Sequence, residues 1–251
     1  MNSNNPFFKT KSFKENNEAT HDAVIIDYNQ TMTVSGTINK SFLMLILLIA
    51  SAAITWMMTL NGQNPIALTL GGGIVGFVLV LISVFRPQYS TFLAPGYAIF
   101  EGLFIGGLSA IFEVMYPGIV IQAVSCTFVT FMVCFGLYKY GVVKVNDRFR
   151  SVVVAATLAI ATYYLISWLL SLFTSFQPIH YGNSMISIGI SAFVIVIAAL
   201  NLFLDFDQIE RGAAQRLPKY MEWYGAMGLM ITLVWLYIEF LRLLSKLSSR
   251  D

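Results

Sequence analysis

The chain has 251 residues, of which 57% are hydrophobic and only 11% are charged, and its formal net charge is +2. Soluble domains carry about 25% charged residues, so this composition excludes an ordinary soluble protein and indicates an integral membrane protein. The small net charge and the scattered basic residues also argue against nucleic-acid binding, which needs a concentrated basic patch.

The first 40 residues are polar and mix lysines with acidic residues. A cleavable secretory signal would place its apolar core much earlier in the chain. We therefore expect residues 1–40 to form a cytosolic, largely flexible N-terminal tail. A transmembrane domain should follow at residues 41–247.

Seven apolar segments follow the tail, each close to the roughly 20 residues that cross a bilayer as a helix. Turn-forming residues separate several of them, as at 61–65, 86–87 and 116–118. The predicted spans are 42–60, 66–85, 92–115, 119–138, 151–173, 184–204 and 223–244. The predicted fold is therefore all-α, with seven transmembrane helices.

The basic residues are distributed unevenly between the two sides of these spans. The tail and the loops after the second, fourth and sixth spans hold 12 of the 15 lysines and arginines, whereas Arg242, Lys246 and Arg250 fall on the other side. Because cytosolic segments of membrane proteins are enriched in Lys and Arg, we expect a cytosolic N-terminus. Seven spans then place the C-terminus outside.

Five acidic residues lie in or beside the predicted spans, namely Glu101, Glu113, Asp205, Asp207 and Glu239. An Asp at the centre of a membrane helix costs at least about 2.5–3.5 kcal/mol on insertion scales. Each acid within a span therefore needs either a partner or a function.

Glu101 lies in the third span beside Gly102 and Gly106, which are four residues apart and form a smooth stripe on one helix face. We expect a neighbouring helix to approach closely along this stripe. Glu101 then either faces a polar centre of the bundle or hydrogen-bonds to a Ser, Thr or Tyr of the neighbouring helix.

The end of the sixth span crowds three acids, Asp205, Asp207 and Glu210, into six residues. On a helix Asp205 and Asp207 point about 200° apart, so one can face the bundle while the other faces the headgroups or a vestibule. We expect the inward residue to be Asp205, with Gln208 on the same side, and Glu210 to be a solvated charge.

In the seventh span, Glu239 precedes Arg242 by three residues, a spacing that allows an ion pair along one face.

Two of these segments resemble the most recognisable motifs of the transmembrane Bax inhibitor motif family. They are Leu204-Asp-Phe-Asp-Gln-Ile209 at the end of the sixth span and Leu236-Tyr-Ile-Glu-Phe-Leu241 in the seventh. Glu101-Gly102 in the third span and residues 33–40 before the first also fit. The long tail is similar to that of a bacterial branch, and the resemblance extends from about residue 33 to the C-terminus.

The resemblance implies a seven-helix protein of the plasma (inner) membrane, in which the other six helices surround the last. It implies a pH-sensitive calcium leak channel whose gate and pH sensor are a carboxylate pair, matched here by Asp205 and Glu239. Asp207, Glu101, Arg242 and Gln208 are then expected to support the pair or line the pore.

The chain departs from this pattern in two ways. The second acid is Glu where the characterised bacterial leak protein has Asp, and the spacing from Asp205 to Glu239 is longer. The seventh helix must therefore begin near Gly225 or later for Glu239 to lie near the middle of the membrane.

Two carboxylates that meet in a low-dielectric site share a proton and titrate as a unit. When ionised they offer the hard oxygen ligands that Ca²⁺ prefers. We therefore expect protons and Ca²⁺ to compete for Asp205 and Glu239, with Ca²⁺ bound transiently as the permeating ion. No cofactor is expected.

Two other functions remain open. One is a stress-protective interaction protein that restrains a membrane protease, with the tail as the binding segment. The other is a proton-coupled cation exchanger, which also uses buried carboxylates. Enzymatic activity is not expected, because the two histidines, His21 in the tail and His180 in an outer loop, cannot serve a buried nucleophile.

Overall fold

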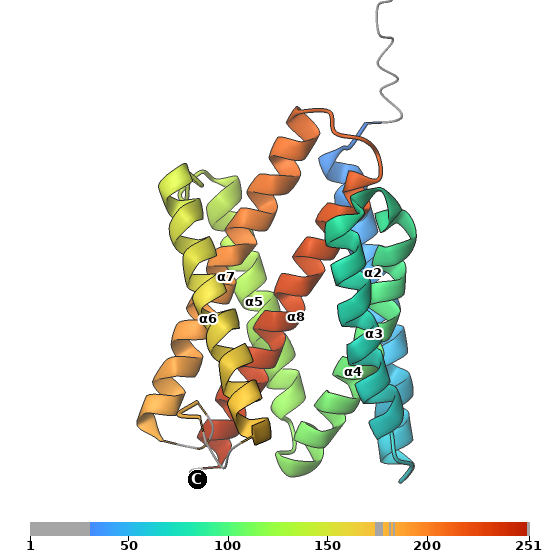
Figure 1. The fold of residues 1–251 in the computed structure, drawn as a ribbon, viewed down its shortest axis with the longest axis vertical. Helices are drawn as coiled ribbons and strands as arrows, with labels where there is room; N and C mark the ends of the chain where they lie inside the picture. Colours follow the sequence, from blue (N-terminus) through green and yellow to red (C-terminus); the bar gives the residue numbers. More distant parts are fainter. Residues whose placement is uncertain (1–30, 174–177, 181, 183, 250–251) are drawn as a thin grey trace, which may run out of the picture. The chain divides into compact units, whose positions relative to one another are not determined.

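The structure is a computed structural model, and it describes residues 31–173, 178–180, 182 and 184–249. Residues 1–30 of the expected N-terminal tail lie outside the described residues. The α-helices are α2 (Val34–Leu60), α3 (Ile66–Phe85), α4 (Ser90–Met115), α5 (Ile119–Lys139), α6 (Asp147–Phe173), α7 (Met185–Ala214) and α8 (Met221–Ser248), and a short 3₁₀ helix, η3 (Pro87–Tyr89), precedes α4 (Figure 1).

Within the described residues, seven helices are long and apolar enough to cross a membrane. This confirms the predicted all-α, seven-span fold. The link between α4 and α5 is a tight turn that depends on glycine. Gly118 there has a φ of +84°, a conformation that is strained for residues with a side chain.

The first helix begins eight residues before the predicted span. Thr33 caps it, because its side-chain oxygen accepts a hydrogen bond of 3.0 Å from the backbone N–H of Gly36. The expected boundary at residue 40 therefore falls inside α2, and residues 34–40 are helical. Hydropathy alone could not locate this start, since the first two turns are polar.

The helix α7 continues to Ala214, ten residues beyond its predicted end. Between the predicted end at residue 204 and Gly212 there is no glycine or proline, and the charged residues there are compatible with helix. Asp207 and Arg211 also pair at 2.8 Å across one turn. The crowded acids therefore lie on one continuous helix of 30 residues, longer than the roughly 20 that the hydrocarbon layer requires.

Glycines allow α2, α3 and α4 to pack closely. A Cβ on Gly102 would lie 1.9 Å from Ser51 Oγ, and one on Gly106 would lie 2.1 Å from the carbonyl oxygen of Ala52. On the next face of α4, a Cβ on Gly107 would lie 1.9 Å from Thr69 Oγ1 of α3. The predicted close approach along the glycine stripe is confirmed, and the neighbouring helix is α2.

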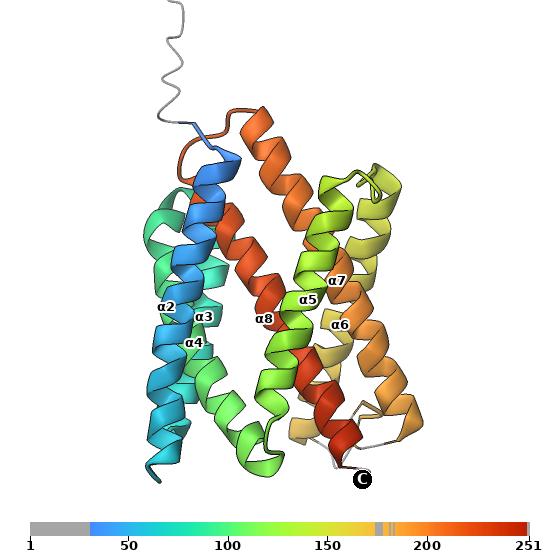
Figure 2. The same ribbon diagram turned by 180° about the vertical axis from the view of Figure 1, so that it is seen from behind.

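The last helix, α8, is central. It packs against α2, α4, α5 and α7, while α3 packs mainly on α4 and α6 packs on α7. Figures 1 and 2 show α8 between two groups of helices, α2 to α4 on one side and α5 to α7 on the other. The helix α6 reaches α8 through Tyr164. The central position expected for the last helix is therefore observed.

Candidate functional site

The side chain of Asp205 extends from α7 toward the first half of α8. Its Oδ1 lies 3.9 Å from the position that a Cβ on Gly228 would occupy, and Thr232 lies beside the carboxylate. The other oxygen, Oδ2, is buried and has no hydrogen-bond partner among the described residues. An unpartnered buried carboxylate oxygen is costly, so this atom is suited to accept a proton or a cation.

A cavity of about 120 Å³ adjoins Asp205, between Val80 and Val84 of α3 and Gly228 of α8. A second cavity of about 190 Å³ lies toward the C-terminal end of α7, where Arg150 and Arg211 line it. The two cavities share four lining residues: Gln208, Ile209, Tyr224 and Gly225. They therefore lie side by side and lead from the basic end of the bundle toward Asp205.

The neighbouring acids of α7 face other partners. The Asp207 Oδ2 pairs with Arg150 of α6 at 2.6 Å and with Arg211 at 2.8 Å. Glu210 is exposed and accepts a hydrogen bond from the hydroxyl of Tyr138 of α5. The helix thus separates the acids as its geometry predicts: Asp205 faces α8, whereas Asp207 is neutralised by two arginines.

Glu239 lies in the second half of α8, and only 1% of its side chain is exposed. Its Oε1 pairs with Arg242 at 3.1 Å and accepts a hydrogen bond of 3.3 Å from the hydroxyl of Tyr164. The Arg242 guanidinium also lies over the Tyr164 ring, 5.4 Å from its centre. The predicted pairing with Arg242 is confirmed. It leaves Oε2 buried and without a hydrogen-bond partner among the described residues.

Asp205 and Glu239 occupy different levels of the bundle. Thr232, which lies beside Asp205, precedes Glu239 by seven residues, about 10 Å along a helix axis. The helix α8 begins at Met221, before the start at Gly225 that a meeting near the middle of the membrane would need. The two carboxylates therefore lie at different levels of the bundle and do not form the contacting pair that the resemblance implies.

An apolar segment divides these two sites. Leu202 of α7 and Leu236 of α8 are fully buried and belong to one hydrophobic cluster. Leu202 lies one turn before Asp205 on α7, and Leu236 lies between Thr232 and Glu239 on α8. The polar surroundings of Asp205 and of Glu239 are thus separated by closely packed leucines.

The other expected residues lie at the edge of the Asp205 site. Gln208 is exposed and lines both cavities. Glu101 of α4 faces α3, with Oε2 3.0 Å from the position of a Cβ on Gly76. Val80, one turn further along α3, lines the Asp205 cavity. Glu101 is therefore near the wall of that cavity but does not line it.

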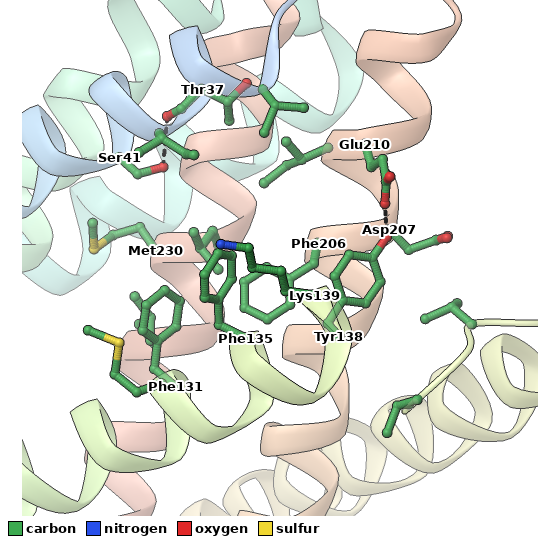
Figure 3. Close-up of a pocket in the computed structure, with 18 of the residues that line it drawn as sticks. Thr37, Ser41, Phe131, Phe135, Tyr138, Lys139, Phe206, Asp207, Glu210 and Met230 are labelled. Atoms are coloured by element: carbon green, nitrogen blue, oxygen red, sulfur yellow. Dashed lines mark hydrogen bonds between the residues drawn. The ribbon is translucent and has the colours of Figure 1, made fainter. Parts of the chain in front are cut away.

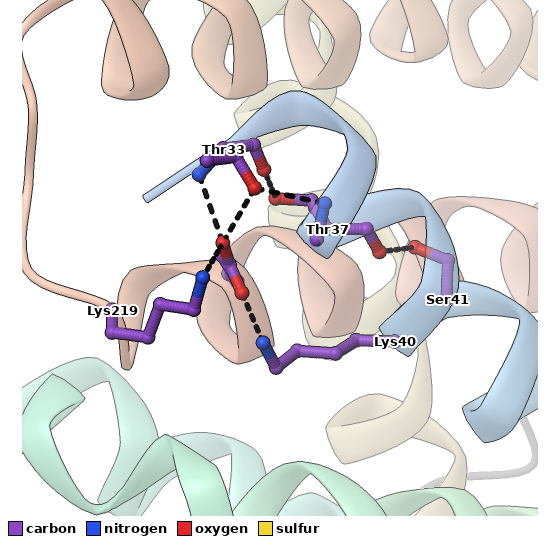
Figure 4. Close-up of polar contacts among 7 residues, drawn as sticks. Thr33, Thr37, Lys40, Ser41 and Lys219 are labelled. Atoms are coloured by element: carbon purple, nitrogen blue, oxygen red, sulfur yellow. Dashed lines mark hydrogen bonds and ion pairs between the residues drawn. The ribbon is translucent and has the colours of Figure 1, made fainter. Parts of the chain in front are cut away.

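A further buried carboxylate, Glu222, lies in the first turn of α8, outside the motifs singled out from the sequence. It accepts hydrogen bonds of 2.9 Å from both the backbone N–H and the hydroxyl of Thr33. It also pairs with Lys219 at 3.1 Å and with Lys40. Figure 4 shows Thr33, Lys40 and Lys219 converging on this carboxylate. Glu222 therefore joins the start of α2 to the start of α8.

Only one partner of Glu222 leaves a local signal in the sequence, namely Lys219 three residues earlier. Thr33 is 189 positions away and Lys40 is 182 positions away. Gly36 makes room for the carboxylate, since a Cβ there would lie 2.2 Å from Oε1. This arrangement follows from tertiary packing, which no short motif encodes.

His180 lies outside the spans, near the Glu239 end of the bundle. Its Nδ1 is 3.0 Å from the hydroxyl of Tyr163, and its ring contacts that of Tyr164. Burial, together with the nearby charges of Arg242 and Lys246, lowers the pKa of His180 below its usual 6.5. The imidazole is therefore neutral at neutral pH, and protonation would add a positive charge near those of Arg242 and Lys246.

Acidification should destabilise the fold through His180. Because the folded-state pKa is lowered, the unfolded chain binds a proton first, so this contribution to stability is complete above about pH 6.5 and is lost as the pH falls. We expect the melting temperature of the detergent-solubilised protein to decrease on acidification, and His180→Asn to reduce that decrease. His21→Asn, which changes the other histidine, should keep the wild-type slope. Identical slopes for the two variants would contradict this account.

Comparison with known protein families identifies a family for the chain. The model of a family described as Bax inhibitor 1 like matches residues 5–249. The matched range includes the segments of α7 and α8 that carry Asp205 and Glu239. No curated protein matches the chain.

Proposed function

The chain belongs to the Bax inhibitor 1 like family, and we propose that it is a pH-sensitive leak channel for calcium and related cations. Asp205 and Glu239 are its proton-sensitive cation sites, placed in series along α7 and α8. The role is transport along a gradient, without catalysis and without a resident cofactor.

The observation that supports this proposal best is the pair of buried, unpartnered carboxylate oxygens, Asp205 Oδ2 and Glu239 Oε2. Native proteins pair the large majority of their buried polar side-chain atoms, so each exception requires an explanation. An ionisable residue at membrane depth is by default a candidate for an ion or proton pathway. Both exceptions lie on the two helices that carry the family-like motifs.

Protons and cations would compete at these oxygens. Deprotonated Asp205 offers a free carboxylate oxygen to Ca²⁺, which prefers hard oxygen ligands, and Gln208 lines the same cavity. Among the described residues, no group of three His, Cys, Asp or Glu side chains is placed to hold a metal. An ion held by so few ligands leaves readily, as conduction requires.

The buried leucines between the two sites would act as the closed barrier. A hydrophobic constriction excludes water and therefore ions, and Leu202 and Leu236 are both fully buried. We infer that the structure corresponds to a non-conducting state. Opening then requires α7 and α8 to separate at the level of these leucines.

We place the Asp205 end of the bundle in the cytosol of the plasma (inner) membrane. Most described basic residues outside the membrane core lie at this end, including Arg86, Lys139, Lys144 and Arg148, and cytosolic ends are rich in Lys and Arg. In this orientation Asp205 is reached from the cytosol, and Glu239 lies nearer the outer surface.

The test is calcium flux into proteoliposomes that contain the purified chain and a trapped calcium indicator. We expect the wild-type flux to change when the pH of the medium is stepped. Asp205→Asn keeps the size of the side chain but removes its titration, so the flux should no longer respond to pH. Glu239→Gln should weaken the response in the same way.

Glu210→Gln is the matched control, because it removes an exposed carboxylate from the same end of α7. It should keep the wild-type pH response. If both Asp205→Asn and Glu239→Gln keep that response, the two carboxylates are not the pH sensors. Uphill accumulation of Ca²⁺ driven by a proton gradient would instead identify an exchanger.

A further inference from the structure

A lateral groove runs between α2 and α5, which both pack on α8 but scarcely touch each other. Two cavities occupy it, one of about 650 Å³ toward the basic end and one of about 430 Å³ beyond it. They share four lining residues, Leu45, Phe128, Met230 and Leu233. The groove is therefore continuous, with α8 as its floor.

The walls of the groove are apolar, and its mouth is cationic. Phe131 and Phe135 of α5 and Phe206 of α7 line its first part, and Figure 3 shows them with Tyr138 and Lys139 around the same pocket. Lys139 and Lys144 lie at this end, are exposed, and make no ion pair within the described residues.

The two carboxylates at the same end do not cancel these charges. Asp207 is already paired with Arg150 and Arg211, and Glu210 accepts a hydrogen bond from the Tyr138 hydroxyl. Counting both arginines and both lysines, four cations face two carboxylates. The mouth therefore carries a net positive charge that is available to an anion.

We propose that this groove binds one anionic phospholipid, with an acyl chain between α2 and α5 and the phosphate on Lys139 and Lys144. The dimensions fit one leaflet. From Lys139 to Phe128, α5 descends 11 residues, about 16 Å, and half of a hydrocarbon core of about 30 Å is about 15 Å. An acyl chain anchored at Lys139 would thus end where the two cavities meet.

The sideways opening of the groove favours a lipid over a soluble anion. Phe42 of α2 and Met132 of α5 line it and are each 62% exposed, so its edges face the hydrocarbon layer. An occupant must therefore enter from the bilayer. Juxtamembrane lysines attract anionic headgroups, each strengthening binding by about fivefold.

The test is native mass spectrometry of the full chain in detergent, with added phosphatidylglycerol or phosphatidylcholine at equal concentration. We expect one retained phosphatidylglycerol per chain, held at least about tenfold better than phosphatidylcholine. Lys139→Gln with Lys144→Gln should abolish this preference. Arg86→Gln with Arg148→Gln is the matched control, since it removes the same charge from the same end without altering the groove, and it should keep the preference.

A second pair of variants tests the acyl-chain part of the groove. Ser41 lines the groove, so Ser41→Phe should fill it and lower lipid retention. Leu43→Phe introduces the same side chain at a position that is 45% exposed and does not line the groove, and should have no effect. Three results would overturn the proposal. They are equal retention of the two lipids by the wild type, an unchanged preference in the double lysine variant, or a wild-type dimer that Ser41→Phe converts to a monomer, because a second chain would then occupy the groove.

Discussion

Gly106→Ala is expected to prevent α2 from docking on α4. The new Cβ would lie 2.1 Å from the carbonyl oxygen of Ala52 and 2.4 Å from Thr55 Oγ1. The nearer atom belongs to the backbone, so no change of rotamer relieves the overlap and the two helices must move apart. Overpacking typically costs about 1–3 kcal/mol and occasionally more, and this contact should reach or exceed the upper value.

The measurements are the yield of monodisperse protein in size-exclusion chromatography and its melting temperature in detergent. Gly71→Ala is the control, because a Cβ on Gly71 meets nothing within 4 Å. In an open helical position the same exchange stabilises by about 0.5–1 kcal/mol. Equal melting temperatures for the two variants would show that the close approach of α2 and α4 does not support the fold.

On the proposed function, Leu236→Ala is expected to raise the calcium flux severalfold. Leu236 is fully buried between the levels of Asp205 and Glu239. Truncation removes apolar bulk from this barrier and lets water enter between α7 and α8. Because hydrophobic constrictions block ions by excluding water, a wetted segment should conduct without a change in pH. Calcium uptake into proteoliposomes at one fixed pH measures the effect.

The control for this prediction is Leu241→Ala. Leu241 is also fully buried in α8 but belongs to a different cluster, which contains residues of α2, α4 and α5. Both truncations should destabilise the fold by about 2–5 kcal/mol, so a general loosening would raise the two fluxes alike. An increase confined to Leu236→Ala supports the barrier, and unchanged flux in that variant counts against it.

Local signals in the sequence were sufficient for much of the fold. Each span is an apolar segment of nearly bilayer length, so hydropathy located all seven. The spacing of Gly102 and Gly106 predicted a close helix contact, and the spacing of Glu239 and Arg242 predicted an ion pair. In each case the partners are neighbours on one helix, and helical periodicity alone places them on one face.

The helix ends could not be predicted in the same way, and they decide the geometry of the candidate site. Hydropathy reports where a segment leaves the hydrocarbon layer, whereas hydrogen bonding and capping decide where a helix ends. The helix α7 continues through its charged residues, and α8 begins at Met221. These two shifts place Asp205 and Glu239 at different levels, which the motifs alone did not indicate.

The leucines that lie between the two carboxylates also could not be predicted from the sequence. Leu202 and Leu236 look like any other apolar residues of a span, since a barrier leucine and a lipid-facing leucine have the same chemistry. Only the packing of α7 against α8 distinguishes them. The glycine and charge patterns in the sequence predicted the polar residues of the candidate site. They did not predict Leu202 and Leu236, the apolar residues that lie between Asp205 and Glu239.

The contacts of Glu222 have a consequence for how the protein is made. A ribosome delivers α2 first and α8 last, and N-terminal parts of a chain generally fold before C-terminal ones. Five further spans are therefore synthesised before Thr33 and Lys40 can contact Glu222. A chain that stops short of residue 222 lacks the carboxylate that neutralises Lys40 and anchors the start of its own first helix. The contacts that hold the start of α2 are therefore completed only when the last helix has been made.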